Sequence, residues 1–60
     1  MPDMEKVAKL TSLLEERSGH NVREASVRFY NYLSNEEFRI YDKEVDYLID
    51  TLGVEVELPF

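Results

Sequence analysis

Regularly spaced carboxylates are the residues of this sequence whose chemistry is easiest to name. Asp42, Asp46 and Asp50 stand four residues apart, and on a helix that spacing places them in one row. A row of this kind can dock a basic partner or hold a hard cation. A solvated helix face is the favoured interpretation, because charged residues mostly line exposed faces and no second carboxylate cluster completes a metal shell.

Other catalytic and metal-binding chemistry has little support in the residue types present. The chain has one histidine, His20, and no cysteine, so a single chain cannot assemble a catalytic triad, a cysteine–histidine pair or a histidine-rich metal centre. The segment 38–44 resembles the start of an EF-hand. An EF-hand loop opening at Asp42 needs Gly at its sixth position and Glu at its twelfth, where this chain has Tyr47 and Gly53. We therefore expect no catalytic residue, no metal and no cofactor.

The charge balance bears on the kind of partner. The 60 residues include 7 Lys and Arg against 13 Asp and Glu, for a formal net charge of −6. Binding to nucleic acid draws its affinity from basic side chains that neutralise phosphates, and here the basic residues are spread along the chain without a cluster. Direct nucleic-acid binding is therefore disfavoured, and a protein partner with a basic or apolar surface fits better.

Chain length limits stability and organisation. Residues 1–60 form one small domain, and without cysteine neither a disulfide nor a thiolate zinc site supplements its core. A chain of this size buries only about 60% of its unfolded surface, so we expect it to self-associate, most simply as a dimer. No apolar run approaches a membrane span, and the first residues lack the apolar stretch of a signal peptide. We expect a cytoplasmic protein with no membrane contact.

Three turn signals divide the chain. Gly19 with Asn21, Ser34 with Glu37, and Gly53 are typical of helix ends and helix caps. They predict an all-α fold, a small three-helix bundle with helices at about 3–17, 22–33 and 35–52 and a short extended C-terminal tail at 54–60.

Apolar residues at helical spacing predict the core side of each helix. They are Met4, Val7, Leu10, Thr11 and Leu14, then Val22, Ala25, Phe29, Tyr32 and Leu33, then Phe38, Tyr41, Val45, Leu48 and Leu52, with Ile49 beside the last stripe. A strand is the alternative for 26–33, which is rich in β-branched and aromatic residues. The cap at Asn21 and the absence of strict alternation favour the helix.

Some apolar residues fall off these faces. Leu13, Val27 and Tyr30 do so, and Ile40 and Tyr47 stand seven residues apart opposite the stripe of the third predicted helix. A second apolar face indicates a contact surface or burial on both sides. The sequence leaves two interpretations of this second apolar face open: it forms a homodimer interface, or the C-terminal tail covers it.

Alternating apolar and acidic residues mark the tail, from Val54 to Leu58, before it ends in Pro59 and Phe60. A lone strand is unstable, so the tail must lie along the helices, pair with the same tail of another subunit, or add to a partner's sheet. One reading is that Val54, Val56, Leu58 and Phe60 close the helical core, with the glutamates in water.

The last four residues also allow a second reading. Glu57-Leu58-Pro59-Phe60 resembles the acidic, Pro-Phe-terminated tip through which bacterial single-stranded-DNA-binding proteins recruit repair and replication enzymes. The resemblance covers about six residues of the sixty, and Val56 departs from the acidic run of those tips. It implies that the terminal Phe enters an apolar pocket while its carboxylate and the preceding acids meet basic groups.

We therefore expect a small acidic helical interaction module that binds and modulates another protein and self-associates, not an enzyme. The alternative is an accessory or regulatory factor in nucleic-acid transactions, either a helical transcription regulator or an acidic decoy of a DNA-binding protein. An enzyme limited to carboxylate and tyrosine chemistry is the weakest hypothesis. The candidate partner-binding residues are Ile40, Tyr47, Glu55, Glu57, Leu58, Pro59 and Phe60.

Overall fold

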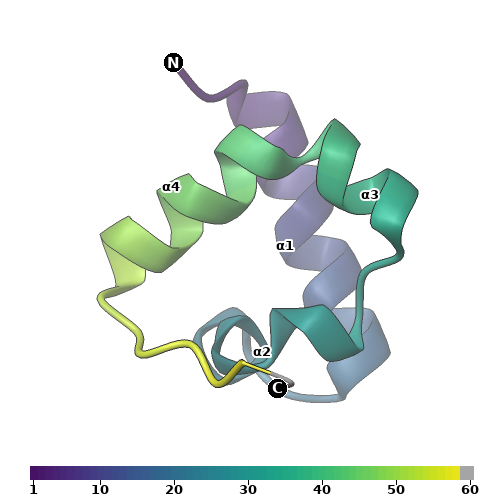
Figure 1. The fold of residues 1–60 in the computed structure, drawn as a ribbon, viewed down its shortest axis with the longest axis vertical. Coiled ribbons are helices and arrows are strands. Elements are labelled where there is room, and N and C mark those ends of the chain that lie inside the picture. The colour runs from purple at the N-terminus through teal and green to yellow at the C-terminus, as the bar shows by residue number, and fades with distance from the viewer. Residues whose placement is uncertain (59–60) are drawn as a thin grey trace.

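The computed structural model describes residues 1–58, which fold as four α-helices around one core (Figure 1). In chain order they are α1 (Met4–Ser18), α2 (Val22–Val27), α3 (Asn35–Ile40) and α4 (Asp42–Leu52), with a 3-10 turn η1 (Phe29–Asn31) between α2 and α3. Helix accounts for 71% of this part of the chain, and it contains no strand. The predicted all-α bundle is confirmed.

Four helix boundaries match the turn signals: the end of α1 at Gly19, the starts of α2 and α3 after Asn21 and Ser34, and the end of α4 at Gly53. The Asn21 side chain accepts a hydrogen bond from the Glu24 N–H at 2.9 Å. Ser34 and Glu37 form a full capping box, in which each side chain accepts from the other residue's backbone N–H. Gly53, with φ of +63°, ends α4 in the left-handed conformation that glycine adopts without strain.

Helix α2 is shorter than the predicted helix at 22–33. Arg28 leaves helical geometry, with φ −128° and ψ 40°, and η1 carries the chain onward. Branched and aromatic side chains lose rotamer freedom in an α-helix, and the segment after α2 is rich in them, which accounts for the break. Phe29 and Leu33 are nevertheless buried, so the tighter turn keeps the predicted face on the core.

The predicted helix at 35–52 bends at Tyr41, whose φ of −110° and ψ of 20° separate α3 from α4. A straight helix of that length would be roughly 27 Å long, as long as the longest extent of the molecule, 27 Å. The bend lets both halves cover one small core. Phe38 of α3 lies 5.2 Å from Phe29, ring centre to ring centre, while Val45 of α4 is buried in the core.

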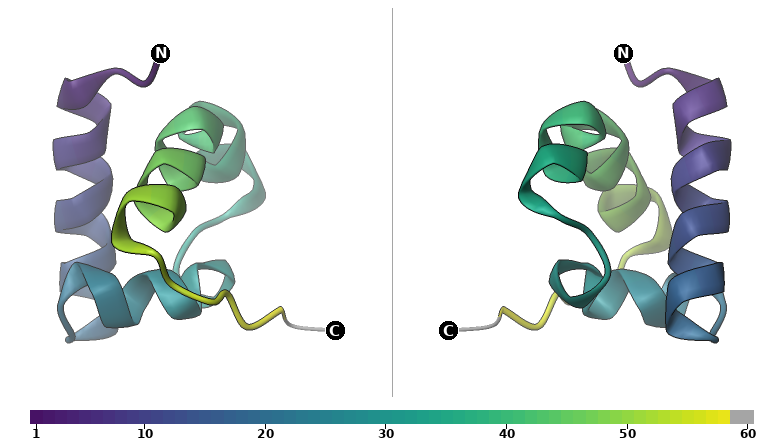
Figure 2. Two further views of the ribbon diagram at one scale, coloured as in Figure 1. Left: turned by 90° about the vertical axis from the view of Figure 1, so that its left-hand side faces the viewer. Right: turned by 90° about the vertical axis from the view of Figure 1, so that its right-hand side faces the viewer.

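Every helical segment except α3 contributes to the buried core. Its apolar members are Val7, Leu10, Leu14, Ala25, Phe29, Leu33, Val45 and Leu48, and the partly buried apolar side chains around them are Val22, Tyr32, Phe38, Tyr41, Tyr47, Ile49, Leu52 and Val56. Figure 2 shows α1 along one side, with α2 crossing at its C-terminal end. The predicted core faces are confirmed apart from Met4, which is 58% exposed.

Arg17, in the last turn of α1, connects three elements. Its Nη1 lies 2.7 Å from Glu37 Oε1 in the α3 capping box and donates to the Tyr32 carbonyl at the end of η1 at 2.8 Å. Hydrogen bonds between ionised partners are the stronger kind. This contact therefore fixes α3 relative to α1 although few apolar side chains lie between them.

The Arg17 contact makes stability depend on pH. The Arg17 guanidinium, and after it the Ser34 N–H, lowers the pKa of Glu37 to about 2 from its ordinary 4.5. Because the folded pKa is depressed, the stabilisation is complete above about pH 4.5 and is lost as the pH falls toward 2. We expect Glu37→Gln to lower the melting temperature near pH 7, with the difference from wild type narrowing over that range. Melting curves followed by circular dichroism measure it.

Glu36→Gln is the matched control, because Glu36 occupies the same turn but is exposed, and its carboxylate has no hydrogen-bond partner among residues 1–58. A Glu37→Gln deficit that stays constant down to pH 2 would contradict the role assigned to the Arg17 contact.

Ser26 of α2 is a buried polar residue in the core. The side chain is 1% exposed, and its Oγ has no hydrogen-bond partner within the described chain. An unpaired buried hydroxyl costs about 1–3 kcal/mol of desolvation. We expect Ser26→Ala to raise the free energy of unfolding by about 1 kcal/mol in urea titrations.

Ser12→Ala, at an exposed position of α1, is the control. Its change in the free energy of unfolding measures the contribution of helix propensity alone. Equal gains from the two substitutions would show that the Ser26 hydroxyl carries no burial penalty.

Candidate functional site

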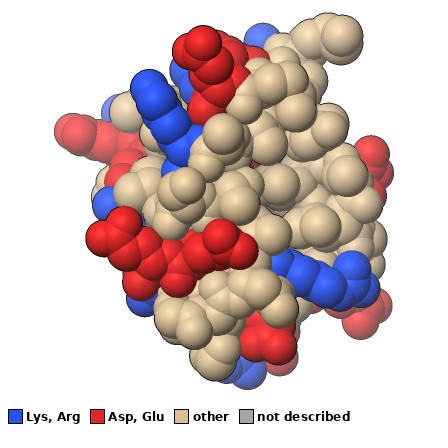
Figure 3. Space-filling model, turned by 180° about the vertical axis from the view of Figure 1, so that it is seen from behind, with Lys and Arg blue, Asp and Glu red and all other residues tan. Residues whose placement is uncertain are grey.

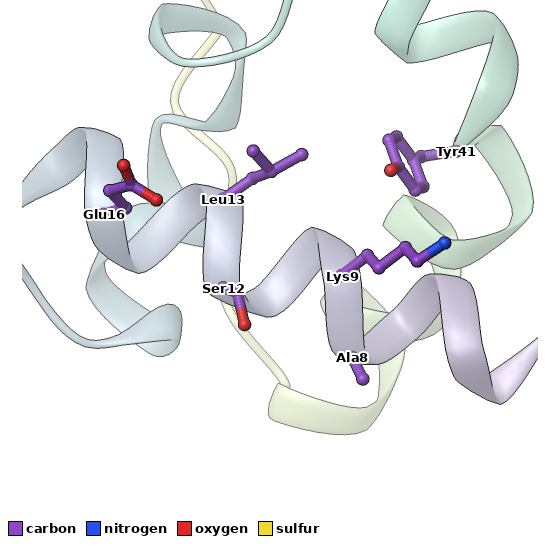
Figure 4. Close-up of a pocket in the computed structure, with 6 residues that line it drawn as sticks. All are labelled: Ala8, Lys9, Ser12, Leu13, Glu16 and Tyr41. Carbon is purple, nitrogen blue, oxygen red and sulfur yellow. The ribbon is translucent and has the colours of Figure 1, made fainter.

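A surface hollow of about 430 Å³ lies between α1 and the bend from α3 to α4. Its lining residues are Ala8, Lys9, Ser12, Leu13, Glu16 and Tyr41. Figure 4 shows Leu13 and Lys9 of α1 directed into the same space as the Tyr41 ring. We call these six residues the α1 hollow.

The α1 hollow combines an apolar floor with charged ends. Leu13 and Tyr41 are half-buried, while Lys9 and Glu16 are exposed. Ser12 is exposed between them and carries a small side chain. This arrangement suits an apolar side chain flanked by one acidic and one basic group, and it offers neither a nucleophile paired with a base nor a cluster of metal ligands.

Uncharged side chains are continuous on the face of the molecule that carries α1. Figure 3 views the molecule from behind Figure 1, the side on which α1 lies, and shows a broad tan area bordered by acidic and basic side chains. Tan includes polar residues such as Ser12, so the apolar part of the hollow is defined by Ala8, Leu13 and Tyr41. Apolar surface with a polar rim is the pattern that marks protein interaction sites.

Sequence reasoning did not find the α1 hollow. Tyr41 was expected within the core stripe of one continuous helix, whereas the bend places it at the edge of the hollow. The available signal was Leu13, an apolar residue off the core face of its helix. A hollow requires a second element beside that residue, and only tertiary structure supplies it.

Ile40 and Tyr47 do not share a helix face. The bend at Tyr41 places Ile40 at the end of α3, 52% exposed, whereas Tyr47 in α4 is half-buried and packs against the core. The expected second face of one long helix is therefore wrong. Whether either residue contacts a partner stays a prediction.

The tail lies against α2 and η1 (Figure 2). Glu57 N–H donates to the Val27 carbonyl at 2.7 Å, and Arg28 Nε donates to the Glu57 carboxylate. This hydrogen bond also raises the pKa of Arg28 above its ordinary value. Backbone and side chain of Glu57 thus both attach the tail to the end of α2.

Side chains along the tail alternate as the sequence predicted. Val54 and Val56 are half-buried and Glu55 and Glu57 are exposed, with Val56 packed against the core. Leu58 departs from the alternation at 56% exposure. The hypothesis that the apolar tail residues cover the helical core is thus confirmed for Val56 and wrong for Leu58. Pro59 and Phe60 lie outside the described residues.

Charged residues singled out in the sequence do not form a metal site. Asp42, Asp46 and Asp50 are all exposed on α4, and nowhere in residues 1–58 do three potential His, Cys, Asp or Glu ligands come together. The His20 imidazole Nδ1 lies 3.2 Å from the Glu24 carboxylate, one turn along the chain.

Comparisons with known proteins give no relative: no protein-family model, curated protein or solved structure matches this chain. In the described part of the chain, no helix has both the length and the apolar character needed to cross a membrane.

Replacement by alanine should affect the stability of the fold more at Val56 than at Leu58. We expect Val56→Ala to lower the free energy of unfolding by about 1 kcal/mol, because part of a packed side chain is removed. Leu58→Ala serves as the control and should change it by less than about 0.5 kcal/mol, because that side chain is mostly exposed. Urea titrations measure both, and a larger loss for Leu58→Ala would contradict this placement of the tail.

Proposed function

We propose that this chain is a small helical interaction module that binds another protein through the α1 hollow. The observation that carries the proposal is the half-buried pair Leu13 and Tyr41, which form an apolar floor open to solvent. A side chain that enters the hollow would remove the remaining exposed part of both from water. Burial of apolar surface is the main driving force of most protein association.

The basic residues of the chain support a protein partner over nucleic acid. Arg17 contacts Glu37, Arg28 contacts Glu57, and Arg23 donates to the Leu52 carbonyl at the end of α4. Lys6 also donates to the Ile40 carbonyl at 3.5 Å, so four of the seven basic side chains are engaged within the fold of a chain whose net charge is −6. Binding to phosphates would compete with contacts that hold the helices together.

The shape of the hollow also favours a protein partner. Its volume of about 430 Å³ is within the range of small-molecule sites, about 300–1,000 Å³, but such sites enclose most of their ligand. Here Leu13 and Tyr41 form the floor, and the hollow is open to solvent rather than enclosed. A large partner that brings its own surface can close the open side.

Substitutions in the hollow test the proposal. A photo-crosslinking residue at the exposed Ser12 should capture the partner, whereas the same residue at the exposed Thr51 of α4 should not. We expect Leu13→Glu to weaken binding of the captured, purified protein at least about tenfold in calorimetric titration, because it places a charge in the apolar floor.

Ser12→Arg is a second variant that fills the hollow from an exposed position, so it separates loss of binding from loss of folding. Circular dichroism establishes that each variant is folded. A captured protein that binds wild type, Leu13→Glu and Ser12→Arg with equal affinity would overturn the proposed site.

The exposed row Asp42, Asp46 and Asp50 supports the alternative of an acidic decoy for a DNA-binding protein. That function predicts a different pattern in the same titrations. Asp46→Lys would weaken binding in a salt-dependent manner, and Leu13→Glu would not.

A further inference from the structure

We infer that the α1 hollow is occupied by the α1 helix of a second copy of this chain, lying antiparallel to the first. The inference rests on the proposed function, because it names a second copy of this chain as the protein that binds the same surface. Three features carry it: the placement of Lys9 and Glu16, the small residue between them, and the apolar floor beside them.

Lys9 and Glu16 have opposite charges and lie in one line on α1. Seven residues separate them, which corresponds to about 10 Å along the axis and only about 20° around it. Both are exposed, and neither side chain takes part in a hydrogen bond or ion pair within residues 1–58. They are too far apart to pair within one helix.

Two-fold symmetry makes this pattern self-complementary. An axis perpendicular to α1, passing midway between Ser12 and Leu13, brings Lys9 opposite Glu16 of the second copy. The same operation brings Glu16 opposite Lys9 of the second copy, because every contact in an isologous interface occurs twice. A parallel arrangement in the same register would instead place like charges opposite each other.

The centre of this arrangement suits close packing. Near the axis Leu13 of each copy meets Leu13 of the other. The two small Ser12 side chains face each other on the other side of the axis and let the helices approach closely. Tyr41 lines the hollow on the Leu13 side and so borders the same contact. The half-buried apolar floor becomes covered without a change in the fold.

The dimer should be weak. Stable interfaces bury about 800 Å² per partner, and one face of the 15-residue helix α1 offers less. We therefore expect a monomer at about 10 μM and a substantial dimer near 1 mM, which corresponds to a dissociation constant of order 100 μM.

Charge reversal and re-reversal test the arrangement by sedimentation equilibrium of the purified chain. We expect Lys9→Glu and Glu16→Lys each to weaken the dimer about tenfold, because symmetry makes each substitution create two repulsive pairs. The double variant restores both pairs and should return to within about threefold of wild type. Lys43→Glu and Asp46→Lys are matched controls, with the same charge changes at exposed positions of α4.

Three results would overturn the inference. A chain that is monomeric at about 1 mM has no such dimer, and single reversals that leave dimerisation unchanged exclude this interface. A dimer weakened by Ile40→Asp and not by Lys9→Glu would place the contact at α3 instead. The proposed function fails separately, when a captured protein binds independently of Leu13, so the two failures are distinguishable.

Discussion

Helices this short can exist here only because they share one core. Isolated helices of fewer than about 12–15 residues are marginal in water, and α2 and α3 have six residues each. Their stability must come from packing against α1 and α4. The eight buried apolar side chains of the core therefore stabilise the helices as a group, while the capping residues set where individual helices begin and end.

Polar contacts then fix the helix ends to which the core does not reach. Arg17 joins the C-terminal end of α1 to the capping box of α3 through Glu37. At the opposite end of α1, the buried Glu44 of α4 accepts a hydrogen bond from the Asp3 N–H at 3.0 Å. A carboxylate in the first turn of α4 is also favoured by that helix's dipole. A hydrogen-bonded carboxyl group thus attaches each end of α1 to the rest of the fold.

Sequence periodicity was sufficient to predict the all-α class and most of the core. Leu10, Leu14, Val45 and Leu48 are buried as their helical spacing indicates. The breaks at Arg28 and Tyr41 could not be predicted, because neither position carries glycine or proline. They arise from packing between elements: aromatic side chains follow α2, and α3 and α4 must both reach a core too small for a straight helix.

The candidate site was less predictable than the fold for the same reason. Ile40 and Tyr47 were expected to share a face on the assumption of one continuous helix, and the bend removes that face. Leu13 was recognised as surplus to the core of its own helix. Its neighbour in the hollow, Tyr41, lies 28 positions later in the sequence. No local sequence pattern links the two residues.

The apolar residues outside the predicted helix core faces thus have two locations: some pack against the core, and others stay partly exposed at the surface. Val56 returns to the core because Glu57 attaches the tail to Val27 and Arg28. These contacts hold the tail at the end of α2. Glu57 lines a second hollow there, and the residues of that hollow are His20, Glu24, Val27, Arg28, Tyr32 and Glu57. None of them lines the α1 hollow. The described tail therefore does not line the space between Leu13 and Tyr41. Apolar surface left open in this way supports the proposal that a second polypeptide covers it.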